Sequence, residues 1–302
     1  MKKLKTKLKF EWWWLLIFGV WFLIYKFIKR SEMIVAIERA LPLREAGLLA
    51  GMVWGERGGI RGDLYKMLIN TGLVHMVVVS GANLTIVGKN LIEVLAKYIG
   101  RRMAIIWGGG VILIYVNLVG WQIPVIRALL FLGIYYLAQI LGRRFRTDRG
   151  LFLVGLMMVL ADFGVLSDVS FWLSMMAFLG VIVSRDEGVF KNTLWVSLLV
   201  LPILSLKFGT ISLLTPISNL AVLFLVEILT IMGFVGSILS LWWQFLGKII
   251  LGSCYPLLRY LIEVVEGVGK WKVGVVNFQF NWWMLAGWYL IIGAYWYEKK
   301  KV

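Results

Sequence analysis

The sequence contains very few of the side chains that build metal centres and disulfides. Histidine and cysteine occur once each, as His75 and Cys254. A structural zinc ion takes about four such ligands, so the usual zinc site is excluded, and a single cysteine excludes an internal disulfide. No G-x-x-x-x-G-K-[ST] phosphate loop occurs either. The chain therefore has no evident ATPase, nuclease or metal centre, and we expect neither enzymatic activity nor a cofactor.

Charged residues are scarce as well, and this scarcity indicates the class of protein. They make up 16% of the 302 residues, whereas hydrophobic residues make up 61% and the mean hydropathy is +0.85. A soluble domain is roughly 45–50% apolar and about 25% charged. A chain this apolar has too little polar surface to cover itself in water. Its apolar runs approach the length of membrane-spanning helices, about 17–25 residues, so we predict an all-α integral membrane protein.

The apolar runs predict a polytopic helical bundle of about ten spans. Several runs are short or interrupted by polar residues, which is typical of broken helices. The run Leu48–Val53 is too short to span a membrane and predicts an interfacial or re-entrant helix. No linker or repeat divides the chain, so we predict one membrane domain. The predicted spans are Trp12–Ile28, Val74–Ala96, Met103–Val119, Ile123–Leu141, Leu151–Val165, Val169–Val183, Leu194–Leu206, Ile217–Leu241, Phe245–Val264 and Trp282–Tyr297.

Basic residues predict the orientation of these spans, because cytoplasmic loops carry an excess of lysine and arginine. Both termini and the most basic loops fall on one side, which we predict to be cytoplasmic, and Lys29 to Gly72 then lies outside. The formal net charge of +16 fits attraction to anionic membrane lipid and also fits a polyanionic cargo. The cytoplasmic basic residues are Lys2, Lys3, Lys5, Lys7, Lys9, Arg101, Arg102, Arg143, Arg144, Arg146, Arg149, Lys299, Lys300 and Lys301.

A polar interruption occurs in the stretch Thr71–Leu84, TGLVHMVVVSGANL. Its tetrad Ser80–Asn83 is small and polar within an apolar run. Lipid cannot satisfy the backbone groups that a helix break frees, so a break faces protein or a water-filled cavity. We predict that the tetrad is non-helical or kinked and borders a transport path, with Asn83 pointing at that path. On sequence grounds alone, His75 is a buried imidazole at a helix start.

Ionisable side chains within the spans are further candidates, because each is costly in lipid and usually faces a cavity or a partner. Arg127 lies near the start of one span, and Glu227 lies in the middle of another. Arg259 and Glu263 are four residues apart, which predicts an intrahelical ion pair. Asp168 directly precedes an apolar run, so its carboxylate is predicted to cap the following helix.

Five blocks of sequence occur in an order that is specific, although each motif alone is loose. Thr71–Leu84 contains T-G-x-x-H-x-x-x-x-S-G, and Ile123–Leu130 contains P-x-x-R-A. The others are Pro42–Glu56 (PLREAGLLAGMVWGE), Ser167–Val181 (D-x-x-F-x-L-S-x-x-A-x-x-G) and Thr210–Leu220 (S-x-x-x-P-x-x-N-L). Together they resemble the membrane domain of ComEC-type competence proteins, which carry transforming DNA across the inner membrane of bacteria.

The chain departs from the pattern of that family. The family typically has a second histidine where Asn83 stands and often has glutamine where Trp172 stands. Full-length members also carry an OB-like domain outside the membrane and a metallo-β-lactamase-like domain at the C-terminus. We expect neither here, because no alternating strand pattern of sufficient extent appears and the metal ligands are absent. The chain resembles a reduced, channel-only member.

The resemblance implies a multi-pass protein of the bacterial inner membrane that takes up single-stranded DNA through a channel during natural transformation. It divides the chain into residues 1–41, with the basic segment, first span and start of the external segment; 42–241, the channel domain; and 242–302, the C-terminal spans and basic tail. The implied partners are single-stranded DNA, membrane lipid, a separate cytoplasmic motor, external DNA-capture proteins and further copies of the chain. The candidate path residues are His75, Ser80, Gly81, Asn83, Pro124, Arg127, Asp168, Ser174, Asn219 and Glu227.

Some of these residues have expected roles. Pro124 supplies a second helix break, and Asn219 lines the path or ties helices together. Arg127 contacts phosphate or pairs with an acid, and we expect the pairing, because a single arginine in a pore would trap phosphate. Broken helices, Glu227 and His75 also suit a secondary transporter of a small solute or ion. A non-transporting assembly subunit is a third hypothesis.

Overall fold

The computed structural model of the chain describes residues 29–56, 58–60, 62–73, 81–184, 188–212, 215–270 and 275–299. These residues are almost wholly helical, with one antiparallel pair of three-residue strands, so the all-α class is confirmed. The elements are α2 (Arg30–Ala40), α3 (Leu43–Trp54), α4 (Gly62–Asn70), α6 (Gly81–Ile99), α7 (Arg101–Val119), α8 (Ile123–Ile140), α9 (Thr147–Ala161), η1 (Phe163–Ser167), α10 (Val169–Val183), α11 (Val189–Phe208), β1 (Thr210–Ser212), α12 (Thr215–Leu239), α13 (Gln244–Ser253), α14 (Tyr255–Gly269), β2 (Val275–Asn277) and α15 (Trp282–Lys299).

The predicted spans that begin at Met103 or later coincide with helices α7 to α15, and the described part of Val74–Ala96 lies in α6. Two predicted spans are each divided between two elements: α9 with η1, and α13 with α14. The span Trp12–Ile28 lies outside the described residues, so the full number of spans stays a prediction. Four helical stretches of the described chain are long and apolar enough to cross a membrane: Arg101–Val119, Ile123–Ile140, Ser218–Leu239 and Gln244–Gly269.

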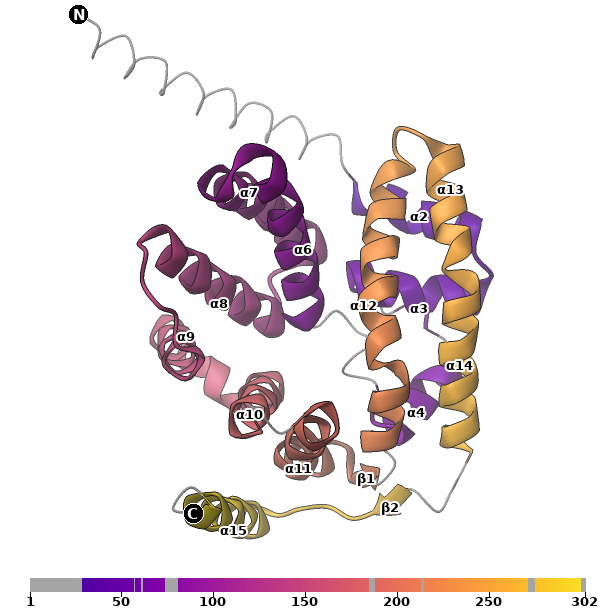
Figure 1. Cartoon of the computed structure of the whole chain (residues 1–302). Helices are drawn as coiled ribbons and strands as arrows, with labels where there is room; N and C mark the ends of the chain where they lie inside the picture. The colour runs from indigo at the N-terminus through magenta and orange to yellow at the C-terminus, as the bar shows by residue number, and fades with distance from the viewer. Residues whose placement is uncertain are drawn as a thin grey trace, which may run out of the picture.

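The helices form two connected groups (Figure 1). Helix α12 runs beside α13 and α14, and α2, α3 and α4 lie across them. Helices α6, α7 and α8 form the second group. After α8, the chain continues through α9, α10 and α11 to β1, and α15 lies beside α11. Buried apolar side chains of α2–α4, α6–α8 and α12–α14 make one continuous core, and a smaller core joins α8, α9, η1 and α10.

Helix α3 is buried along nearly its whole length, from Glu45 to Trp54. Gly55 ends it with a left-handed backbone, at a φ of 71°. Trp54 stacks on Phe234 of α12, with ring centroids 5.8 Å apart. The segment that we expected outside therefore packs among the helices, because α3 is apolar enough to be buried against α12. This placement agrees with the re-entrant interpretation of Leu48–Val53, and the membrane side of the segment stays a prediction.

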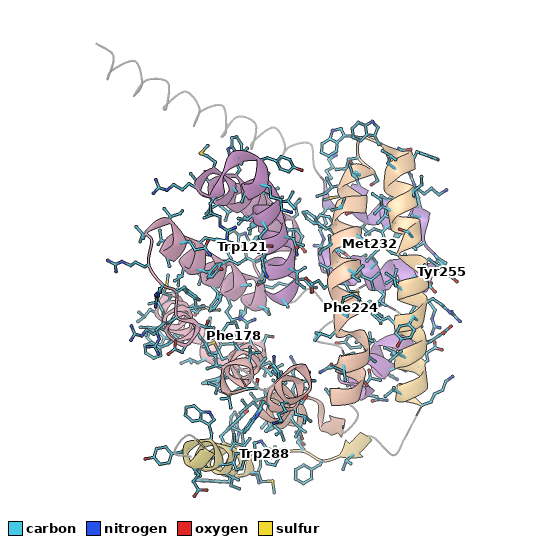
Figure 2. The ribbon with its side chains drawn as sticks, viewed as in Figure 1. Trp121, Phe178, Phe224, Met232, Tyr255 and Trp288 are labelled. Atoms are coloured by element: carbon cyan, nitrogen blue, oxygen red, sulfur yellow. The ribbon has the colours of Figure 1, made fainter. Side chains whose placement is uncertain are left out.

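Helix α11 contains an internal proline whose effect is compensated by α15. Pro202 has no N–H to donate to the carbonyl of Leu198, four residues earlier. The indole Nε1 of Trp288 donates to that carbonyl at 3.0 Å, and the Tyr289 hydroxyl donates to the Leu199 carbonyl at 2.7 Å. Trp288 of the aromatic helix α15 thus satisfies the carbonyl that the proline leaves open, Tyr289 adds a second bond beside it, and Figure 2 labels Trp288 at this junction.

Two local predictions from the sequence are confirmed. The Asp168 carboxylate accepts a hydrogen bond from the backbone N–H of Ser170 and caps the start of α10. Arg259 and Glu263 form an intrahelical ion pair of 3.0 Å on α14. Both contacts join residues two to four positions apart, so sequence spacing alone was sufficient to predict them.

Candidate functional site

The first turn of α6 lies directly against the first turn of α8. A Cβ atom on Gly81 would lie 2.6 Å from the Pro124 carbonyl oxygen, 2.8 Å from Arg127 Nη2 and 3.1 Å from Ala128 Cβ. A residue with a side chain would collide with the Pro124 backbone, so only glycine allows this approach. Three of the candidate residues, Gly81, Pro124 and Arg127, therefore meet at one helix junction.

The predicted break in the tetrad is corrected by the structure. Gly81 to Asn83 are helical and open α6, so the expectation of non-helical or kinked backbone is wrong for these residues. The glycine of this stretch allows α6 to lie directly against α8. Ser80 and His75 lie outside the described residues.

Asn83 ties two helices together. Its side chain has no exposed area, and its amide Nδ2 donates to the Met52 carbonyl oxygen at 2.8 Å. Met52 is near the C-terminus of α3, where backbone carbonyls have no partner within the helix. The next carbonyl, that of Val53, accepts from the Tyr115 hydroxyl of α7 at 2.6 Å. Asn83 is therefore buried against α3, and the tie between α6 and α3 is the role that this contact supports.

The turn before α6 reaches α12. Gly72 has a left-handed backbone with a φ of 72°, and a Cβ there would collide with the side chain of Thr215. Thr215 opens α12, the helix that carries Asn219 and Glu227. The two ends of the Thr71–Leu84 block thus contact the starts of α12 and α8, while its Asn83 contacts α3.

Arg127 has a half-buried side chain. None of the ion pairs in the described part of the chain involves it. The acid partner that we expected is therefore not found among these residues. Phosphate groups are the anions that such a fork of N–H donors binds well.

Two polar residues on α12 differ in their surroundings. Asn219 is buried, with 8% of its surface exposed, and its Oδ1 has no hydrogen-bond partner. Glu227 is exposed on the apolar helix and forms no ion pair within the described residues. It shares a helix face with Leu223 and Phe224, which is labelled in Figure 2, and both of these are exposed. Glu227 therefore places a carboxylate on an exposed and otherwise apolar face of α12.

Asp168 directly precedes α10, and Ser174 lies within this helix. Asp168 is used as a helix cap, as described above, and Ser174 is half-buried.

Sequence reasoning also missed two members of the α3 junction, Tyr115 and Ser237. Ser237 Oγ accepts from Trp54 Nε1 at 3.2 Å. In the sequence, both residues are recognisable only as hydroxyl side chains within apolar runs.

The chain matches known proteins over much of its length. Residues 52–301 match a family model described as "Competence protein". A curated protein of Aquifex aeolicus, described as an "Uncharacterized protein", is 29% identical over 152 residues, which cover 50% of this chain and 36% of that protein. The chain thus spans about a third of that relative's length. No solved structure matches the chain.

Proposed function

Since this chain belongs to the competence protein family, we propose that it carries DNA as a single strand across the bacterial cell membrane during natural transformation. The family match over residues 52–301 is the observation on which this proposal rests. The blocks that resemble ComEC-type proteins also meet in space: Gly81 lies against Pro124 and Arg127, and Gly72 lies against Thr215. Motifs that are distant in the sequence therefore share one region of the fold.

The strand passes beside the junction of α6 and α8, where Arg127 contacts its phosphates. The absence of an ion pair for Arg127 within the described residues supports this role, because a paired guanidinium would be neutralised. Conduction needs several weak sites, because a single strong one would trap the strand, so Arg127 is one weak phosphate contact among others along the path. On α12, Glu227 adds an exposed polar group to this region.

The energy for transport comes from a separate cytoplasmic motor, and external proteins deliver the DNA. The sequence contains no phosphate loop, which supports a separate protein as the motor. The site of action is the inner membrane, with both termini cytoplasmic, and further copies of the chain complete the assembly.

Deletion of the gene in its native host, followed by measurement of labelled DNA entering the cytoplasm, tests this function. We expect uptake to disappear and to return with the wild-type gene. Arg127→Gln should restore about a tenth of it, because charge-assisted contacts to phosphate are lost, and Arg127→Lys should restore more. Arg149→Gln is the control, since this exposed arginine lies far along the chain from the junction. Unchanged uptake in the deletion strain would refute the proposal.

A coupled carrier of a small solute or ion is the second candidate, favoured by the exposed, unpaired Glu227 within the described α12. Purified chain in vesicles would then move protons with its solute, and Glu227→Gln would abolish that flux. Glu263→Gln, which removes a carboxylate from an intrahelical pair, is the matched control. Equal flux in both variants would exclude Glu227 as a coupling group.

A further inference from the structure

A cavity of 360 Å³ opens between the start of α7 and the end of α8. Its lining includes Arg101, Arg102 and Ile105 from α7, and Gln139, Leu141 and Gly142 from the end of α8. Ligand pockets typically enclose roughly 300–1,000 Å³, so the cavity is large enough for a small polar group. It lies at the end of α8 opposite to Pro124 and Arg127, and it is therefore separate from the site described above.

One of the two arginines of this cavity, Arg101, is held in place by neutral partners. Arg101 donates from Nε and Nη2 to Oε1 of Gln139, at 3.1 and 2.9 Å, and its guanidinium lies 5.6 Å from the centre of the Tyr136 ring. These contacts fix the direction of the side chain without cancelling its charge, because neither partner is an acid. Arg102 is exposed and forms no ion pair within the described chain.

The first turn of α7 adds to the positive electrostatic potential of the cavity. Gly100 precedes α7 and offers no side-chain cap, and the first turn of α7 contains no acidic residue. The first N–H groups of the helix are therefore open to an anion. At the end of α8, by contrast, Gly142 and Arg143 donate their N–H groups to the carbonyls of Gln139 and Ala138. This motif satisfies two of the carbonyls at the end of α8.

The cavity also has an apolar side. Leu141 is 62% exposed and Ile140 is 36% exposed, and both line the cavity. Helices α7 and α8 are two of the stretches that are apolar and long enough to cross a membrane. The arginines therefore lie where an apolar span ends, which is the level of lipid headgroups.

From these observations we propose that the cavity binds the phosphodiester headgroup of one anionic phospholipid. The phosphate contacts Arg101, Arg102 and the open N–H groups of α7, and an acyl chain follows Ile140 and Leu141. A nucleic-acid strand fits less well, because it would place further phosphates against the apolar residues. The proposal does not depend on DNA transport, and either can fail without the other.

Binding of short-chain lipids to the detergent-purified full chain tests the proposal. We expect phosphatidylglycerol to bind about tenfold more tightly than zwitterionic phosphatidylcholine, because two guanidinium groups favour a net negative headgroup. Arg101→Gln with Arg102→Gln should weaken phosphatidylglycerol binding by about tenfold. The control, Arg144→Gln with Arg149→Gln, removes the same charge outside the cavity lining and should change the affinity less than about twofold.

A second variant distinguishes loss of lipid binding from misfolding. Arg102→Glu reverses the charge of an exposed side chain, so its melting temperature in detergent should match the wild type while phosphatidylglycerol binding is lost. Equal binding of the two lipids would overturn the proposal. Glycerol phosphate binding as tightly as the lipid would assign the cavity to a soluble phosphate compound instead. Displacement of the lipid by a single-stranded oligonucleotide would assign it to DNA.

Discussion

At the scale of single residues, polar side chains in this protein complete the hydrogen bonding of a helix buried in its core. The C-terminal carbonyls of α3 have no partner within α3, and the residues that carry them are buried. Asn83 and Tyr115 donate to two of them, from α6 and α7. An unsatisfied buried carbonyl costs about 1–3 kcal/mol, so these two side chains contribute directly to the stability of the fold.

Asn83→Leu should therefore lower the stability of the protein by about 1–3 kcal/mol, because the Met52 carbonyl loses its donor. Thermal unfolding in detergent measures this, and a reduced folded yield should accompany it. Asn90→Leu on the same helix is the control, since Asn90 donates only to the Ile86 carbonyl of its own helix. Similar melting temperatures for the two variants would show that the bond between α6 and α3 contributes nothing.

Asp168→Ala should reduce folded yield in detergent, with a stability loss of about 0.5–2 kcal/mol, because α10 loses its cap. Asp168→Ser should restore most of it, since a serine hydroxyl accepts the same N–H. Normal melting of the alanine variant together with lost DNA uptake would instead place Asp168 on the transport path.

At the scale of elements, α11 and α15 depend on each other through the proline of α11. Trp288→Phe removes the donor to the Leu198 carbonyl and keeps most of the ring, so we expect a loss of about 0.6–2 kcal/mol, the usual range for hydrogen bonds between membrane helices. Trp283→Phe is the control, because Trp283 is 87% exposed. The variants are compared by thermal unfolding, and equal melting would refute the role of Trp288.

Helix positions could be predicted from the sequence because runs of apolar residues determine them locally. The cap at Asp168 and the pair Arg259–Glu263 could be predicted for the same reason. The burial of α3 could not, since nothing in PLREAGLLAGMVWGE indicates that α12 will cover it. The partner of Asn83 is 31 residues away, and such contacts follow from tertiary packing. Three residues of the tetrad were misread because small and polar residues also occur within helices, as Gly81 to Asn83 do in α6.

At the scale of the whole molecule, the orientation in the membrane stays a prediction from the distribution of basic residues. Reporter fusions at Thr147 and at the C-terminus should both report the cytoplasm, because an even number of spans separates these points. Opposite signals from the two fusions would contradict this topology. If both fusions report the outside, the orientation of the chain in the membrane is the reverse of the predicted one.

The central claim is that DNA passes the membrane beside the junction of α6 and α8. Gly81→Leu tests it most directly, because the added side chain must displace the Pro124 backbone or Arg127. Gly133→Leu is the matched control on α8, where a Cβ meets nothing within 4 Å. Both variants are expressed in the deletion strain, and their amounts in the membrane and their melting temperatures are compared.

The decisive measurement is the amount of labelled single-stranded DNA that reaches the cytoplasm in these strains. We predict that Gly81→Leu abolishes uptake while the protein remains in the membrane, and that Gly133→Leu restores uptake to the wild-type level. Full uptake with a normally inserted Gly81→Leu protein would contradict a transport path at this junction.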